Sequence, residues 1–441
     1  MVQNDPTYIP GGGFRDPVGI QFDPRLGFSW DPFSDGKTAI RVSFGAFHQA
    51  STGGTGALDR GPAFVYTRTL LSSDISPSTF LSTPVTSPVS VSGVYREQKI
   101  PVVYQYMFGV QRDLGHATML DISYVGNTEH YVSQNWNYNY VPFGTRFQPR
   151  YADPSNPAVP LADAFLRPNT GYLDMLMGGP ATSTRYDALQ AKIQRRFAVG
   201  VEIDANYSFS KNFQATGWSQ ELPQSLFYGP SMTDQTHVFN FSYVYDLPKG
   251  SKVVPGRATK WFLDDWRISG ITTFASGFPS NIVLTTTDSY DFTGGGDIGA
   301  GSWQAVDRGS IGTGTPMSIA GVSLSCSTFD GPRSFSQFFN TGCAHRPSGH
   351  GDYGSDFTGY KFRGPGFNNF DISIFKSFPI RESKILQFRW EVYNLFNHPQ
   401  AMTVNNTARF DPAGNQVNAQ FGTVTATRPE RRMQGSLRFT F

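Results

Sequence analysis

The sequence lacks any long hydrophobic run. No stretch of its 441 residues approaches the roughly 18 consecutive apolar residues of a transmembrane helix, so such a helix is excluded. Charged residues make up only 16%, against about 25% in typical soluble domains, and the net charge of +2 does not indicate a nucleic acid partner. The first residues, MVQNDPTYIPGGG, have neither a charged n-region nor an apolar h-region and predict no signal peptide.

Cysteine is also scarce, and two cysteines alone say little about the compartment. We favour a disulfide between Cys326 and Cys343, which would reduce the entropy of a long loop outside the cytosol. Cys343 also lies near His345, His350 and Asp352, which are residue types that bind metals. A metal site is therefore the second interpretation of this region, and free thiols are the third.

Aromatic residues, in contrast, reach 15%, and 46 glycines with 30 prolines indicate many turns. Helical periodicity is nearly absent, whereas apolar and polar residues alternate as they do in a strand with one apolar face. In VEIDANYSFS at 201–210, Ile203 lies on one face, while Glu202 and Asp204 lie on the other. The same alternation recurs at 38–44, 100–112, 118–126, 237–248, 367–375, 386–394 and 431–441.

Strand length separates two interpretations of this alternation. A soluble β-sandwich would also alternate, but its strands have about 5–6 residues. The segments here run to about ten residues, the length that a tilted strand needs to cross a bilayer. Their polar faces carry charge, as at Arg389 and Glu391, so we expect these faces to contact water and the opposite faces to contact lipid.

Short and long connections alternate along the chain, as in transmembrane barrels with short periplasmic turns and long extracellular loops. The long ones are expected at 51–98, 128–184, 212–234, 278–366 and 396–430. The sequence thus predicts an all-β fold, an antiparallel transmembrane β-barrel portion over 1–441 in which 278–366 is a long extracellular loop. We count about eleven strands, whereas bacterial single-chain barrels have even numbers, so we expect a C-terminal piece of a longer protein.

Two fragments imitate nucleotide-binding motifs. DGKT at 35–38 lacks the upstream glycine of a phosphate-binding loop and falls in a hairpin turn. Gly294, Gly296 and Gly299 fit G-x-G-x-x-G, but no strand–helix unit surrounds them, and we interpret them as a flexible loop. No nucleophile or pair of carboxylates suggests catalysis. We expect neither an enzyme nor a cofactor.

The stretch EVYNLFNHP closes the penultimate expected strand and contains Glu391, Asn394, Leu395, Phe396 and Asn397. Together with DQTHVFNFSYVYDLPKG and FGTVTATRPERRMQGSLRFTF, it resembles the C-terminal β-barrel portion of TonB-dependent outer-membrane transporters, in particular the Oar-like barrels of acidobacteria. The resemblance implies a complete barrel of about 22 strands, of which this chain is the C-terminal half. It also implies a plug and a TonB-binding region upstream.

By the same resemblance, Leu437, Phe439 and Phe441 form the assembly signal that the barrel assembly machinery reads. The implied partners are outer-membrane lipid, that machinery, the TonB complex and an unknown small ligand, glycan or peptide. We therefore expect a TonB-dependent receptor or transporter in the bacterial outer membrane. A non-transporting adhesin or structural barrel is the alternative, and a soluble secreted polysaccharide-binding protein is the third possibility.

Overall fold

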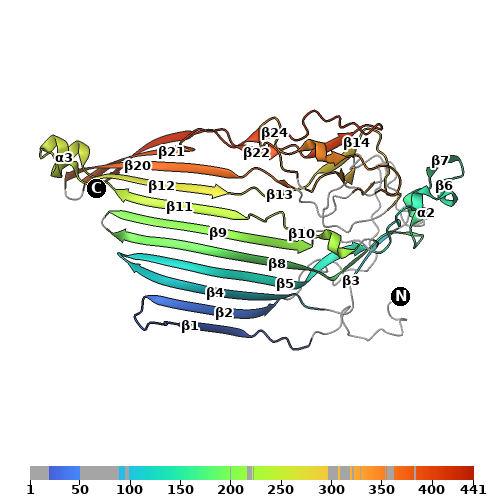
Figure 1. Cartoon of the computed structure of the whole chain (residues 1–441), viewed down its shortest axis with the longest axis horizontal. Helices are drawn as coiled ribbons and strands as arrows, with labels where there is room; N and C mark the ends of the chain where they lie inside the picture. The colour runs from blue at the N-terminus through green and yellow to red at the C-terminus, as the bar shows by residue number, and fades with distance from the viewer. Residues whose placement is uncertain are drawn as a thin grey trace, which may run out of the picture.

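The computed structural model describes residues 19–49, 89–94, 99–198, 200–215, 221, 223–295, 306–307, 318–319, 322–327, 329–352, 354, 362–381 and 384–441. One large sheet dominates the fold, and eleven of its strands follow one another in chain order, each antiparallel to the next (Figure 1). They are β1 (Arg25–Trp30), β2 (Thr38–His48), β4 (Val102–Gly115), β5 (Thr118–Asn137), β8 (Tyr172–Ala198), β9 (Val201–Ala215), β11 (His237–Asp246), β12 (Trp266–Ala275), β20 (Phe367–Arg381), β21 (Lys384–Tyr393) and β25 (Arg432–Thr440). The expected all-β fold of about eleven antiparallel strands is confirmed.

Two further strands join this sheet outside the main order. β3 (Val89–Val94) lies parallel to β8, and β10 (Tyr228–Pro230) pairs with β9. Within the described ranges, β1 and β25 each pair with a single neighbour and so form the two edges of the sheet. No helix in these ranges is long and apolar enough to cross a membrane.

The register of the strands turns the alternation in the sequence into two chemically different faces, because antiparallel pairing places residues of like parity side by side. On what we call the apolar face, six cross-strand neighbours are 41% to 60% exposed: Phe28, Val42, Phe108, Tyr124, Leu189 and Phe209. On the polar face, one row of neighbours is Asp204, Ser242, Ile271 and Asp371. A contiguous exposed apolar surface of this kind suits lipid rather than water.

The connections at the two ends of the sheet differ greatly in length (Figure 1). At the short-turn end, His116 and Ala117 alone separate β4 from β5. The longest connection at that end, residues 247–265, contains η6 (Gly250–Lys252) and α3 (Arg257–Leu263). The opposite end, which we call the loop end, holds the connections around 138–171, 276–366 and 394–431.

The prediction of a long loop over 128–184 was wrong in its bounds. β5 has 20 residues and continues to Asn137, while β8 has 27 residues and begins at Tyr172. The two strands remain paired up to Asn137 and Leu176. This extension makes non-local contacts at the loop end: Asn137 is buried, and β3 pairs with the first residues of β8. Such contacts need no regular apolar alternation, so the sequence pattern does not reveal the extension.

The hydrophobic core of the described residues does not lie in the sheet. It lies at the loop end, where it comprises Ile282, Leu284, Phe292, Val322, Phe329, Phe338, Phe339, Cys343, Ala344, Phe362, Ala408, Phe410 and Phe421. All thirteen belong to just two connections, the one between β12 and β20 and the one between β21 and β25. These loops therefore fold on one another, and we call their described residues within 276–366 and 394–431 the loop cap.

Candidate functional site

The loop cap is held together by short strands contributed by both connections. β14 (Val283–Thr286) runs parallel to β23 (Thr407–Phe410), which joins segments more than a hundred residues apart. β13 (Pro279–Ser280) pairs with β19 (Phe362–Arg363), and β22 (Ala401–Val404) pairs with β24 (Val424–Thr427). Backbone hydrogen bonds of 2.7 Å from Phe338 to Gly422 and of 2.9 Å from Val424 to Phe335 add further links.

Aromatic packing fills the interior of the loop cap. Phe339 has no exposed surface, and its ring centre lies 4.4 Å from that of Phe362 and 5.3 Å from that of Phe421. Leu284 and Ala408, on the paired strands β14 and β23, are also fully buried. Burial of this extent gives the cap a defined shape, which an isolated surface loop does not have.

A third connection packs against the loop cap through an ion-pair network. The Arg146 guanidinium lies 2.8 Å from Asp163 in its own connection and 3.3 Å from Asp291 in the cap. Burial opposes the charged form of Arg146, but the hydrogen bonds and charges of the two carboxylates outweigh it and raise the Arg146 pKa. The Phe147 ring stacks on that of cap residue His350 with the centres 3.8 Å apart.

Gly294 and Gly295 lie in a loop, as expected, and in the structure this loop makes specific contacts. Asp291 accepts hydrogen bonds from the backbone of Thr293 and Gly294, and the Gly294 carbonyl accepts one from Arg146. Gly295 lies so close to the Pro142 carbonyl that a Cβ would clash with it. Glycine is required here by close backbone approach; Gly296 and Gly299 lie outside the described residues.

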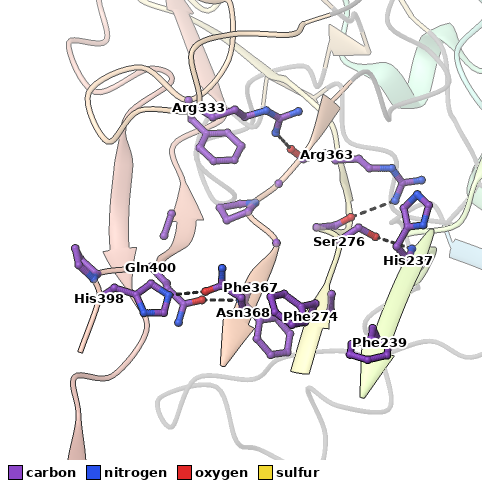
Figure 2. Close-up of a pocket in the computed structure, with 18 of the residues that line it drawn as sticks. His237, Phe239, Phe274, Ser276, Arg333, Arg363, Phe367, Asn368, His398 and Gln400 are labelled. Atoms are coloured by element: carbon purple, nitrogen blue, oxygen red, sulfur yellow. Dashed lines mark hydrogen bonds between the residues drawn. The ribbon is translucent and has the colours of Figure 1, made fainter. Parts of the chain in front are cut away.

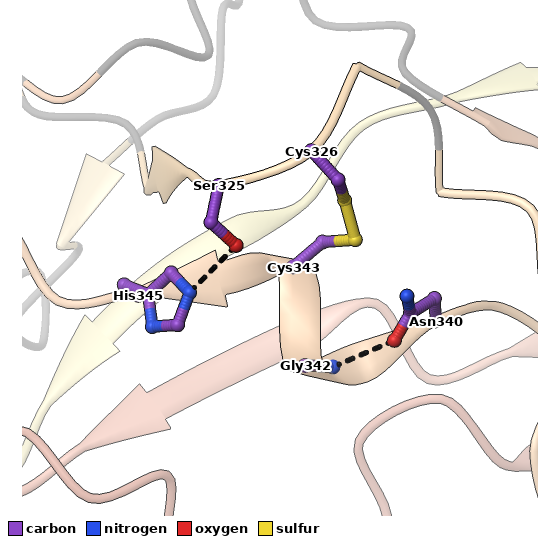
Figure 3. The surroundings of a disulfide bond; sticks show 6 residues. All are labelled: Ser325, Cys326, Asn340, Gly342, Cys343 and His345. Atoms are coloured by element: carbon purple, nitrogen blue, oxygen red, sulfur yellow. Dashed lines mark hydrogen bonds between the residues drawn. A yellow bond between two sulfur atoms is a disulfide. The ribbon is translucent and has the colours of Figure 1, made fainter.

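Cys326 and Cys343 are joined by a disulfide in the loop cap, with their Cα atoms 5.5 Å apart (Figure 3). Cys343 is the last residue of η7 (Thr341–Cys343). The Asn340 side chain caps the start of η7, where it accepts a hydrogen bond of 3.2 Å from the Gly342 backbone N–H. Next to the disulfide, β17 (Ser323–Leu324) pairs with β18 (Ala344–His345).

His345, His350 and Asp352, the residues considered as metal ligands, each contact another residue of the chain instead. His345 Nε2 lies 2.8 Å from Ser325 Oγ, and Asp352 accepts from the backbone and hydroxyl of Ser348. The His350 ring stacks on that of Phe147. Over the described ranges, no group of three or more His, Cys, Asp or Glu side chains is arranged to hold a metal ion.

Replacing both cysteines with serine should lower the stability of the loop cap by about 3 kcal/mol, the chain-entropy value for a closed loop of roughly 15 residues. Tryptic digestion of the cap would measure the change. The reduced wild-type protein and the double variant should be cleaved equally fast, and both faster than the oxidised protein. Equal resistance of oxidised and reduced protein would contradict a stabilising bridge.

The NLFN stretch forms the turn that ends β21. Asn394 and Asn397 both have positive φ, of 54° and 50°, a conformation that asparagine tolerates better than most residues. The Asn394 backbone donates to the Asp371 carboxylate at 2.9 Å, and its side chain donates to the Pro429 carbonyl at 3.2 Å. The Asn397 side chain accepts from the Arg431 backbone at 2.9 Å. The turn thus fixes the ends of β20, β21 and β25 to one another.

The other motif residues complete this junction. Leu395 donates its backbone N–H to the Phe370 carbonyl at 2.8 Å, and the Phe396 ring packs edge-on against the Phe370 ring. Glu391 is 6% exposed on the polar face and accepts hydrogen bonds from Arg389 and from Gln434 of β25. These contacts are structural, and they explain the motif without a ligand.

Asn397→Ala should lower the free energy of unfolding by about 1–2 kcal/mol more than Asn397→Gly. Both variants lose the side-chain acceptor for the Arg431 backbone N–H, but only alanine is strained at positive φ. Urea unfolding of the folded protein in detergent would measure the difference. Equal losses for the two variants would show that φ strain is not what selects asparagine.

A groove of about 790 Å³ lies between the loop end of the sheet and the loop cap (Figure 2). Tyr207, Phe239 and Phe274 form one side, at the loop end of the apolar face. Arg333 and Phe338 of the cap form the other, with the Arg333 guanidinium 4.8 Å from the Phe338 ring centre. The Tyr and Phe rings in this lining suit an apolar or aromatic group.

Hydrogen bonds fix the polar rim of this groove. Arg363 pairs with the buried Asp234, which ties the cap to the connection that leads into β11, and donates to the Gly277 carbonyl within the cap at 3.1 Å. Arg333 in turn donates to the Arg363 carbonyl at 2.6 Å (Figure 2). The rim therefore has a fixed shape.

The polar face offers a second concave surface of about 460 Å³ across β9, β11, β12, β20 and β21. Carboxylates of Glu202 and Asp204 on β9, Asp371 on β20 and Glu391 on β21 line it together with the Arg389 guanidinium. Charges of both signs on one face favour water, ions or a polar ligand.

Sequence reasoning missed the loop cap. It placed the regions 278–366 and 396–430 in separate loops, whereas the structure joins them in one core. The available signal was phenylalanine: residues such as Phe329, Phe339 and Phe410 have no reason to occur in loops that contact only water.

A protein-family model described as an outer membrane beta barrel domain matches residues 3–434. No curated protein matches the sequence at a significant level. Among solved structures, the chain is similar to the outer membrane transporter YddB from Escherichia coli, at 11% identity and a TM-score of 0.43, covering 95% of this chain and 40% of that one.

Two other solved structures have comparable values. The siderophore receptor PirA from Acinetobacter baumannii shows 10% identity and a TM-score of 0.43, with 95% of this chain and 41% of that chain covered. A ferric enterobactin receptor (PfeA) mutant from Pseudomonas aeruginosa shows 9% identity, a TM-score of 0.43, and coverage of 97% and 41%. The chain spans about two fifths of the length of these three structures.

Proposed function

This chain belongs to the outer membrane beta barrel domain family, and we propose that it is the barrel portion of a TonB-dependent receptor that imports a ligand. Its location is the bacterial outer membrane. In this proposal the apolar face contacts lipid, the polar face lines the lumen, and the loop end is extracellular. A plug and a TonB-binding region would belong to other parts of the complete protein.

One observation carries the proposal: the long connections at the loop end form a folded cap with its own buried core. A barrel that only anchors or stiffens the membrane needs no ordered interior in its loops. A preformed surface binds at a lower entropy cost than a flexible loop, so a fixed cap supports ligand capture. The charged polar face below it supports passage of a hydrated ligand.

The test is uptake by cells that express the complete protein, supplied with labelled iron chelates, oligosaccharides and peptides. We expect one class to accumulate only when the proton-motive force is intact. Replacing 278–366 with a short linker should abolish this uptake, while heat-modifiable migration shows that the barrel still assembles. Uptake that persists after the replacement, or that survives a protonophore, would contradict the proposal.

The exposed hairpin of β6 (Ala152–Asp153) and β7 (Asn156–Pro160) provides a matched control at the same end of the sheet. It lies outside the loop cap, at the far edge of the loop end (Figure 1). Replacing its turn with glycine and serine should leave uptake unchanged. Equal loss in both variants would indicate general damage to the loop end.

The proposal keeps Leu437, Phe439 and Phe441 as the assembly signal. All three side chains are exposed, by 70%, 50% and 88%, and the Phe439 and Phe441 ring centres lie 6.0 Å apart. Phe441→Asp should reduce insertion into the outer membrane severalfold, measured by heat-modifiable protein per cell. Thr440→Asp, the preceding residue and of opposite parity, is the control. Normal insertion of the Phe441 variant would contradict the assignment.

A further inference from the structure

The connection between β11 and β12 is unlike the tight turns beside it. Residues 247–265 fold into η6 and α3 and project beyond the short-turn end of the sheet (Figure 1). Neighbouring strands at this end, such as β4 and β5, are joined by two residues. Reversing the chain direction therefore does not require a connection of this length.

Several contacts fix this connection rigidly to the sheet. Asp264 is buried, and its carboxylate accepts a hydrogen bond of 2.9 Å from the Ser251 backbone N–H. The Trp266 indole donates to the Phe262 carbonyl at 2.7 Å. Lys376 of β20, only 2% exposed, donates to the Asp264 carbonyl, and its ammonium lies 4.9 Å from the centre of the Phe378 ring.

Despite this rigid attachment, the connection leaves large apolar side chains uncovered. Val253 is 83% exposed, Phe262 63% and Leu263 53%. Trp261 of the same connection joins it to the apolar face, because its ring packs against that of Phe378, with the centres 5.4 Å apart. Phe378 in turn is followed on the same face by its cross-strand neighbour Leu386 and then by Phe439.

Positive charge surrounds these apolar side chains. Within 247–265 there are four basic residues, Lys249, Lys252, Arg257 and Lys260, all exposed. The two acidic residues of the same stretch are engaged close to the sheet: Asp264 is buried, and Asp265 lies 3.9 Å from Lys249. Exposed apolar and basic side chains together are the composition of segments that lie at a membrane surface.

We propose that residues 249–263 form an interfacial anchor that binds anionic phospholipid headgroups of the leaflet at the short-turn end. Val253, Phe262 and Leu263 enter the boundary between headgroups and acyl chains, while the basic side chains contact lipid phosphates. Continuity with the apolar face sets the depth, because the anchor begins where that lipid-facing surface ends. The inference rests on the membrane-spanning sheet and does not depend on transport.

The test uses the full chain reconstituted in lipid vesicles, with a fluorescent nitrobenzoxadiazole label on a single introduced cysteine. Phe262→Cys reports on the anchor, and Ala413→Cys, exposed in a turn at the loop end, is the matched control. Cys326 and Cys343 do not react while they remain bonded to each other. Val253→Cys is a second anchor position, in case the first variant does not assemble.

With anionic vesicles, we expect phospholipids brominated on the acyl chain to quench the label at 262, and aqueous iodide to quench the label at 413. Adding Lys252→Glu and Lys260→Glu should weaken binding of the anchor to anionic lipid, by about fivefold in the binding constant for each basic charge removed. Equal iodide quenching at 262 and 413 would overturn the proposal. If protection of the label at 262 from iodide grows with the protein-to-lipid ratio, a second copy of the chain covers this surface. That result would also overturn the proposal.

Discussion

Phe339→Ala will unfold the loop cap while the eleven strands of the sheet remain assembled. The Phe339 side chain is fully buried and contacts the rings of Phe362 and Phe421, so its removal leaves a large cavity. Phenylalanine-to-alanine substitutions in protein cores cost about 3–5 kcal/mol. A small unit folded from two loops has only part of the stability of a whole domain, and a loss of this size exceeds what it can absorb.

Limited trypsin digestion would measure this unfolding, because Arg333, Arg346 and Arg363 all lie in the cap. Cleavage at these sites should rise at least tenfold in the variant, while heat-modifiable migration of the barrel stays unchanged. Phe335→Ala is the control: it is in the same loop but 46% exposed, and its hydrogen bond to Val424 uses the backbone. A cap as resistant as wild type would show that these loops do not share a core.

Phe241→Arg will destabilise the protein by about 2–4 kcal/mol, the cost of an arginine on the lipid face near the middle of a membrane. Phe241 lies in the middle of β11 and pairs with Ala205 and Thr272 on the apolar face. The next residue, Ser242, lies on the polar face opposite Asp204. Ser242→Arg should therefore change stability by less than about 1 kcal/mol.

Urea unfolding in lipid vesicles gives both values under one condition. The informative quantity is the difference between the two variants, since both introduce the same side chain into neighbouring positions. A soluble β-sandwich would bury the apolar face and would also penalise Phe241→Arg, but it would not unfold differently in the presence of lipid. Equal losses for the two variants would remove the basis for assigning the faces.

The strands were predictable because their cause is local. Alternation at Ile203, Asp204 and their neighbours appears in the sequence, since each residue responds to the medium on its own side of the sheet. The ends of β5 and β8 were not predictable, because they are held by non-local contacts, such as the pairing of β8 with β3, which leave no regular alternation in the sequence. The disulfide was the favoured interpretation, because Cys326 and Cys343 are the only two cysteines, but the sequence also left a metal site and free thiols open.

The loop cap was not predictable from alternation, because its contacts are non-local. Leu284 pairs with Ala408 in parallel strands, and nothing near either residue specifies the other. The NLFN turn is intermediate: its asparagines were identified by resemblance, but their function follows only from the contacts with Asp371 and Arg431. A shared core also means that removing 278–366 exposes Phe410 and Phe421, so Phe339→Ala is the more specific perturbation.

The most direct test of the account is the accessibility of consecutive positions along β11 in a membrane. Nitroxide labels at each of residues 239–245, in the reconstituted full chain, would be probed with oxygen, which concentrates in lipid, and with a water-soluble nickel complex. We predict strict alternation, with 239, 241, 243 and 245 accessible to oxygen and 240, 242 and 244 accessible to nickel. Nickel accessibility at all seven positions, or no alternation, would contradict a membrane-spanning sheet with one face to lipid and one to water.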